Sequence, residues 1–244
     1  MKIEEKMAQV GTARIYYEVA GKGKPVILLH GLSGSTRWWK WNIRDLAQHY
    51  QVISIDMIGF GRSRGQPFVL RDAAGLLEKW MEEAGIECAS LIGHSMGGYI
   101  AAGLAARSPE RVERLILVDA LAMPIGRTVF RSALGLVEAL RYLPLNFLPV
   151  MFQDALQAGP VTLIQAIREV MAADQRPILG RIRMPTLILW GEHDTLLPVE
   201  AGRQLHQCLP QAEYQVIAGA GHNPMWDRPE PFNRAVLDFL GRGR

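Results

Sequence analysis

The stretch that decides the fold is CASLIGHSMGGYIAAGLAA, residues 88–106. Its first part, CASLIG (88–93), is an apolar run of strand length, and good helix formers dominate the segment 96–107. Between them lies GHSMGG (93–98), where glycine weakens strands and helices alike. The glycines therefore predict a tight strand-to-helix turn with Ser95 at its centre. Two interpretations are open at this point: a glycine-rich packing turn, or a serine held there to react.

On both sides of this turn, short apolar runs alternate with helical patterns. We expect two strands within 7–20 around Gly11, further strands at 25–30, 51–56, 88–93, 114–119, 186–190 and 213–218, and helices at 36–49, 69–84, 96–107, 198–208 and 229–241. This alternation predicts an α/β fold, with a mostly parallel sheet covered on both faces. Ligands of such sheets bind beyond the carboxyl ends of the strands, so functional residues are expected in the loops there.

The stretch between the strands at 114–119 and 186–190 has a different composition. It is rich in Leu, Met, Phe and Pro and lacks β-branched runs. A structureless loop of this length is uncommon in a compact domain. We therefore expect a small helical cap at 121–184, inserted after the sixth strand and lying over the carboxyl edge. The α/β core is then formed by 1–120 and 185–244.

Composition narrows the function classes. The chain has 244 residues, 49% hydrophobic and 21% charged, which suits one large globular domain. The net charge is +3, and the Lys and Arg residues form no long run, so a nucleic-acid partner is not expected. The most apolar long stretch, 133–152, is interrupted by residues such as Glu138 and Arg141, which argues against a membrane span. A small-molecule substrate is the expected partner, and monomer and homodimer are both open.

Cysteine usage and the N-terminus bear on location. The two cysteines, Cys88 and Cys208, show no disulfide framework and no metal-ligand spacing. The N-terminal segment MKIEEKMAQV carries acidic residues where a signal peptide is apolar. We expect a cytoplasmic protein.

A serine hydroxyl becomes a useful nucleophile only when a base removes its proton, and histidine is the usual base. His222 is the best candidate, because it follows the expected strand at 213–218 in a loop at the carboxyl edge. His49 and His206 are expected within helices, and His94 should point away from the serine oxygen.

The base needs an acidic partner that fixes its tautomer and stabilises the imidazolium. Asp194 follows the strand at 186–190 and is the preferred candidate. Glu192 on the same loop and Asp119 at the end of the strand at 114–119 compete with it. A purely structural role for Asp194, as a turn former before Pro198, is the other alternative.

The chain order Ser95, Asp194, His222, the His30-Gly31 pair after an apolar strand and DMIGFGRS at 56–63 resemble the α/β-hydrolase fold superfamily. The likeness extends from about residue 8 to 241. It implies an oxyanion hole formed by the backbone N–H groups of Leu32 and Met96. It also implies structural roles for His30 and Asp56 in bracing their turns, and no metal or cofactor.

Single positions separate the subfamilies that the chain resembles. Haloalkane dehalogenases and epoxide hydrolases are expected to carry aspartate where this chain has Ser95. Carbon–carbon bond hydrolases of aromatic degradation are similar through Ser95 and Trp226, but His94 and Asn223 depart from their pattern. The SMGG run is shared with cofactor-free haloperoxidases.

The apolar cap predicts an apolar substrate of modest size. Two roles are open for Trp38, which shares a helical face with Trp41: core packing or lining of an acyl pocket. The candidate pocket residues are Trp38, Leu136, Leu140, Phe147 and Met151.

We therefore predict a serine hydrolase that cleaves carboxylic esters through Ser95, His222 and Asp194. The alternatives are a carbon–carbon bond, thioester or lactone hydrolase with the same three residues, or a non-catalytic ligand-binding protein on the same scaffold.

Overall fold

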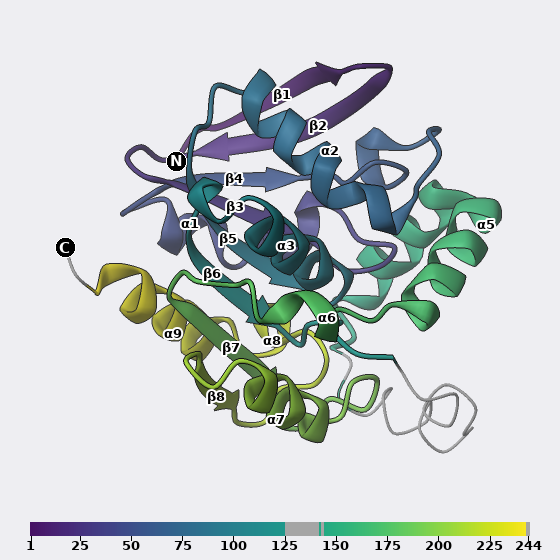
Figure 1. Ribbon diagram of the computed structural model, residues 1–244. Helices are drawn as coiled ribbons and strands as arrows, with labels where there is room; N and C mark the ends of the chain where they lie inside the picture. The colour runs from purple at the N-terminus through teal and green to yellow at the C-terminus, as the bar shows by residue number, and fades with distance from the viewer. Residues whose placement is uncertain (125–141, 143, 243–244) are drawn as a thin grey trace.

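The computed structural model describes residues 1–124, 142 and 144–242, and a central eight-stranded sheet dominates it (Figure 1). The strands are β1 (Ile3–Val10), β2 (Ala13–Ala20), β3 (Pro25–Leu29), β4 (Gln51–Ile55), β5 (Ala89–His94), β6 (Val112–Val118), β7 (Thr186–Gly191) and β8 (Glu213–Ile217). They lie in the order β1-β2-β4-β3-β5-β6-β7-β8. β1 pairs antiparallel with β2, and β2 with β4, whereas every other pairing is parallel. The predicted mostly parallel sheet is confirmed.

The burial of the strands explains their sequences. All six residues of β5 are buried, as are all six of β7, because helices cover both sides of the sheet. Such strands read as continuous apolar runs rather than alternating ones. The edge strand β1 is mostly exposed and carries the charged residues Glu4, Glu5 and Lys6 instead.

Helices pack on both faces of the sheet. The longer ones are α2 (Leu70–Glu83), α3 (Met96–Arg107), α7 (Val199–Cys208) and α9 (Pro229–Gly241), and the short ones are α1 (Ile43–Leu46), α8 (Pro224–Asp227) and the 3₁₀ turns Thr36–Trp39, Gly61–Ser63 and Pro109–Arg111. One core cluster joins the sheet to α2, α3 and α7, on the near side in Figure 1. A second cluster joins the opposite face to α1 and α9.

The helix predicted at 36–49 is wrong as a single element. The structure has the 3₁₀ turn Thr36–Trp39 and the short α1, separated by three residues that include Asn42. The Asn42 side chain is fully buried and donates to the Met225 carbonyl and to Asn233 Oδ1. This demand for tertiary partners overrides the local helical preference. Trp38 and Trp41 therefore do not share a face: Trp38 is 5% exposed and Trp41 is 42% exposed.

Helices do occupy the described part of the insertion between β6 and β7. They are α5 (Leu148–Ala172) and α6 (Arg176–Leu179). α5 is kinked at Gly159, whose φ of 77° is accessible to glycine, and Pro160 begins the second half. The predicted pocket residues Leu136 and Leu140 lie outside the described residues. The division into a core (1–120 and 185–244) and a cap (121–184) remains a prediction.

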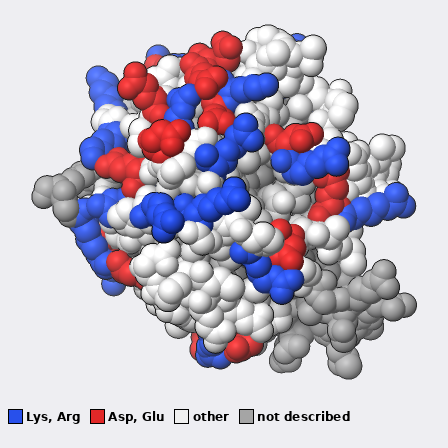
Figure 2. Space-filling model, viewed as in Figure 1, with Lys and Arg blue, Asp and Glu red and all other residues white. Residues whose placement is uncertain are grey.

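Charged side chains of both signs are spread over one face of the molecule (Figure 2). On the face drawn in Figure 2, Lys and Arg are interspersed with Asp and Glu rather than gathered in one basic field. No helix in the described part of the chain is both long enough and apolar enough to cross a bilayer.

A buried carboxylate fastens α5 to the core. Asp154 is completely buried, and it accepts hydrogen bonds from Ser35 Oγ at 2.9 Å and Trp38 Nε1 at 3.0 Å. Arg37 forms an ion pair with its other oxygen. Three donors from one short segment therefore compensate the desolvation of one carboxylate of α5.

We predict that Asp154→Ala lowers the free energy of unfolding by about 3 kcal/mol, because two buried donors lose their acceptor. Urea denaturation measures this change. Asp174→Ala is the matched control, since Asp174 is exposed and its side chain bonds only to Arg176 among the described residues. The control should keep the wild-type stability, and an equal loss in both variants contradicts the role of Asp154.

Candidate active site

The backbone at Ser95 is held in an unusual conformation between β5 and α3. Its φ is 52° and its ψ is −115°, a region that non-glycine residues rarely adopt. The Ser95 N–H donates to the Val118 carbonyl, and the Ser95 carbonyl accepts from the N–H groups of Gly98 and Leu121. These bonds fix the turn from both neighbouring elements, so the side chain projects at the carboxyl edge of the sheet.

The glycines of GHSMGG are required by close backbone approach. A Cβ atom on Gly93 would lie 2.4 Å from the Gly97 carbonyl oxygen, and one on Gly97 would lie 2.3 Å from the Leu29 carbonyl oxygen. Both distances are far below van der Waals contact, and the obstacles are backbone atoms that do not swing aside. The packing role and the positioning of Ser95 are thus two aspects of one arrangement.

The structure brings together the three side chains that the sequence placed far apart. His222 Nε2 lies 3.1 Å from Ser95 Oγ, and His222 Nδ1 lies 2.7 Å from Asp194 Oδ2. The other Asp194 oxygen accepts the N–H groups of Leu196 and Leu197, at 2.8 and 2.9 Å. Asp194 is 5% exposed, so its carboxylate is held with little freedom to rotate.

Neither of the other two candidate acids, Glu192 and Asp119, is the hydrogen-bond partner of His222 Nδ1. Glu192 accepts a hydrogen bond from the Gly219 N–H and is half-exposed, away from His222 Nδ1. Asp119 is completely buried beside Asp194, with one oxygen accepting the Gly191 N–H at 2.8 Å. It does not bond His222, so Asp194 is the histidine's partner.

His94 is buried beneath the site. Its Nε2–H donates to the His222 backbone carbonyl at 2.7 Å, so this nitrogen is not available as a base, and His222 Nε2 is the ring nitrogen that contacts Ser95 Oγ. Burial holds the pKa of His94 well below its ordinary value, which keeps the ring neutral. The nucleophile turn and the histidine loop are thereby joined.

Two N–H groups are available for an oxyanion. Met96 is the first residue of α3, and Leu32 lies just before Ser33, whose φ is 62°. Among the described residues, neither N–H donates to another protein group. The amino end of a helix carries partial positive charge, which favours an anion at Met96.

His30 and Asp56, for which the resemblance implies structural roles, are buried in their turns and hydrogen-bond to backbone groups. His30 Nδ1–H donates to the Gly31 carbonyl, Nε2 accepts the Met57 N–H, and burial lowers its pKa to about 4. Asp56 accepts the N–H groups of Thr36 and Arg62, while burial raises its pKa to about 6.

Sequence reasoning missed Asp227, which braces the histidine loop. Its Oδ2 accepts the Gly221 N–H at 2.8 Å, and burial raises its pKa to about 6. The sequence offers only a lone aspartate five residues after His222 as a signal, and such residues are common in loops.

Aromatic side chains pack around the site. Trp38 lies 5.8 Å from the His94 ring and 5.0 Å from Phe147, and Phe147 lies 4.6 Å from Trp226, all between ring centroids. Phe147 is fully buried, and Met151 is partly buried against the same cluster. Trp38, Phe147 and Met151 are thus gathered on one side of the site, and their role as pocket residues stays a prediction.

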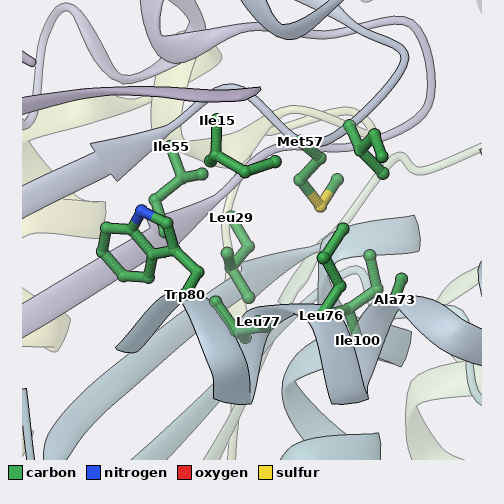
Figure 3. Close-up of a pocket in the computed structure, with 10 residues that line it drawn as sticks. Ile15, Leu29, Ile55, Met57, Ala73, Leu76, Leu77, Trp80 and Ile100 are labelled. Atoms are coloured by element: carbon green, nitrogen blue, oxygen red, sulfur yellow. The ribbon is translucent and has the colours of Figure 1, made fainter. Parts of the chain in front are cut away.

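An apolar cavity of about 30 Å³ lies elsewhere, between the sheet and helices α2 and α3 (Figure 3). Its lining includes Ile15, Leu29, Met57, Leu77 and Trp80, and none of the three polar side chains described above reaches it. This volume holds about one water molecule. We assign the cavity to core packing rather than to substrate binding.

Comparisons with known proteins give the family. The model of the alpha/beta hydrolase family matches residues 26–235. The chain belongs to the alpha/beta hydrolase family. It is therefore a hydrolase, built on the fold that the resemblance predicted.

Individual relatives of this hydrolase differ in substrate. The chain is 30% identical to a putative carbamate hydrolase, RutD, of Yersinia enterocolitica, over 93% of this chain and 92% of that protein. It is 29% identical to a 2-hydroxy-6-oxo-6-phenylhexa-2,4-dienoate hydrolase of Comamonas testosteroni, over 98% and 94%. A thermophilic esterase from Thermogutta terrifontis superposes with a TM-score of 0.84 at 26% identity, over 98% of each chain.

We predict that Gly97→Ala lowers the free energy of unfolding by about 3 kcal/mol or more, because the new methyl group meets the Leu29 carbonyl. Gly75→Ala is the matched control in α2, where an added Cβ meets nothing within 4 Å. It should stabilise the protein by about 0.5–1 kcal/mol through helix propensity. Urea denaturation of both variants is the measurement, and a tolerated Gly97→Ala contradicts the close approach.

Proposed function

We propose that this hydrolase cleaves carboxylic esters by acyl transfer through Ser95, with His222 as the base and Asp194 as its partner. The observation that carries the proposal is the unbroken chain of contacts, 3.1 Å from Ser95 Oγ to His222 Nε2 and 2.7 Å from His222 Nδ1 to Asp194 Oδ2. Both distances are within hydrogen-bond reach, the requirement for proton transfer from nucleophile to base.

In the proposed mechanism, Ser95 Oγ attacks the acyl carbon while His222 Nε2 takes the hydroxyl proton. The Asp194 carboxylate stabilises the resulting imidazolium and holds its tautomer. The N–H groups of Leu32 and Met96 donate to the oxyanion of the tetrahedral intermediate. His222 then protonates the leaving alcohol, and a water molecule repeats the sequence on the acyl-enzyme to release the acid.

Two observations support an ester with an apolar acyl or alcohol part. The aromatic group formed by Trp38, Phe147 and Trp226 borders the site and makes its surroundings apolar. The thermophilic esterase has the same fold over 98% of both chains.

A carbamate or a carbon–carbon bond is the second candidate, favoured by the names of the two relatives at 30% and 29% identity. Carbamate cleavage uses the same acyl chemistry with a different leaving group. His94 and Asn223 depart from the pattern of the carbon–carbon bond hydrolases, which favours the ester.

Ser95→Ala should reduce the hydrolysis of p-nitrophenyl butyrate by roughly 10⁴-fold or more, because the acyl acceptor is lost. The release of p-nitrophenol measures the rate, and thermal denaturation checks that the variant is folded. Ser33→Ala is the matched control, since it removes a hydroxyl from the turn that follows β3 without touching the proposed nucleophile. Undiminished turnover by Ser95→Ala contradicts the mechanism.

A panel of substrates tests which type of bond the enzyme cleaves. We expect kcat/KM for a p-nitrophenyl ester to exceed that for the matched carbamate, lactone and dienoic-acid ketone by at least about tenfold, since each tenfold step requires only about 1.4 kcal/mol of differential transition-state binding. A higher kcat/KM for the carbamate or the ketone replaces the ester with that substrate class while the roles of the three residues stand.

A further inference from the structure

Asp119 is a buried acid at the centre of the site to which the proposed mechanism gives no part. It follows β6 directly, is completely buried and has a φ of 39°, one of three positive values among the described non-glycine residues. Its N–H donates to the Leu189 carbonyl at 2.9 Å, and its Oδ1 accepts the Gly191 N–H at 2.8 Å. The strained backbone and these two bonds hold the side chain in one orientation.

The second oxygen of Asp119 is the unusual atom. Asp119 Oδ2 is buried and receives no hydrogen bond from any described donor. One carboxylate oxygen of Asp119, one of Asp194 and one ring nitrogen of His222 all lie within 4.8 Å of one another. A buried carboxylate oxygen without a donor is costly, and two adjacent carboxylates that are both ionised repel each other strongly in such surroundings.

One proton bound between Asp119 and Asp194 removes both the cost of the unpaired oxygen and the repulsion of the two carboxylates. The hydrogen bonds that each acid accepts indicate which of the two carries the proton. Asp194 already accepts three N–H groups, those of Leu196, Leu197 and His222, and N–H donors pair better with a carboxylate than with a carboxylic acid. Asp119 accepts one. Burial first, and the charge of Asp194 second, raise the pKa of Asp119 well above its ordinary value.

We propose that Asp119 is a positioning residue of the site: its neutral carboxyl group donates its proton to the Asp194 carboxylate and so holds that carboxylate in line with His222. This inference rests on the proposed function, because it assigns a part in the same proton-transfer chain. Asp119 touches neither substrate nor nucleophile and acts through Asp194.

The charges around Asp119 and Asp194 set the electrostatic environment of His222. Asp194, Asp227, His222 and Tyr214 are ionisable neighbours of Asp119 or its partner, and His94 lies beneath them in neutral form. With Asp119 neutral, the pair carries a single negative charge beside the imidazolium. The count matters because a second negative charge there would favour the protonated, inactive base and move the acidic limb of the activity profile to higher pH.

Asp119→Asn is the decisive variant. An amide keeps a carbonyl for the Gly191 N–H and an N–H for Asp194, and it keeps the neutral charge that the proposal assigns. We expect kcat/KM for p-nitrophenyl butyrate within about threefold of wild type, with the acidic limb of the pH profile unmoved, since neither transition-state contacts nor local charge change.

Asp119→Ala removes the donor to Asp194 as well as the acceptor for Gly191. We expect kcat to fall by about tenfold or more while KM stays within about twofold, because a misplaced Asp194 impairs proton transfer but not substrate binding. Glu192→Gln is the matched control: it neutralises a half-exposed carboxylate on the neighbouring loop and should alter neither parameter.

A shift of the acidic limb to lower pH in Asp119→Asn overturns the proposal, because it shows that a negative charge was removed. An unchanged kcat in Asp119→Ala overturns the positioning role. Infrared difference spectroscopy of the substrate-free protein at neutral pH, wild type minus Asp119→Asn, should show the C=O stretch of a carboxylic acid. If only carboxylate bands are lost, the proposal fails.

The infrared test requires no turnover and needs only the isosteric Asp119→Asn, so it decides the proposal even if Asp119→Ala does not fold. It also separates the two claims. Turnover by Ser95→Ala defeats the proposed function and leaves the protonation of Asp119 standing, whereas a charged Asp119 leaves the ester hydrolase standing.

Discussion

The whole site depends on how closely one helix approaches one strand. β5 and α3 meet at a turn where backbone atoms pack against the α-carbons of Gly93 and Gly97, with no room for a Cβ at either position. That approach confines Ser95 to a positive φ and directs its hydroxyl away from the sheet. It also puts the Met96 N–H, at the amino end of α3, beside Ser95, and this N–H donates to no other group in the described part of the chain.

The rest of the sheet brings the partners to this point. Because β5, β6, β7 and β8 are parallel, the loops that follow them open at the same edge and carry Ser95, Asp119, Asp194 and His222 respectively. The loops are then joined by buried hydrogen bonds, such as that from His94 to the His222 carbonyl. Backbone geometry therefore fixes the positions of these four buried or half-buried polar side chains.

Much of this arrangement was predictable from the sequence, because strands buried on both faces and glycines at a forced turn leave unambiguous patterns. The order of the strands' loops gave Ser95, His222 and Asp194 without any distance information. The helix expected at 36–49 was wrong because Asn42 is committed to partners in α8 and α9, which no local pattern reveals. Asp154 was missed because its donors, Ser35 and Trp38, come from a remote segment. Asp227 was missed because a single loop aspartate carries no periodic signal, although its donor, the Gly221 N–H, is local.

The central claim is that Ser95 is an activated nucleophile, and covalent labelling tests it most directly. Intact-protein mass spectrometry after brief exposure to a fluorophosphonate, followed by peptide mapping, should find one adduct on Ser95, and His222→Ala should be labelled far more slowly. No adduct on the folded protein, or an adduct on another residue, would contradict the account.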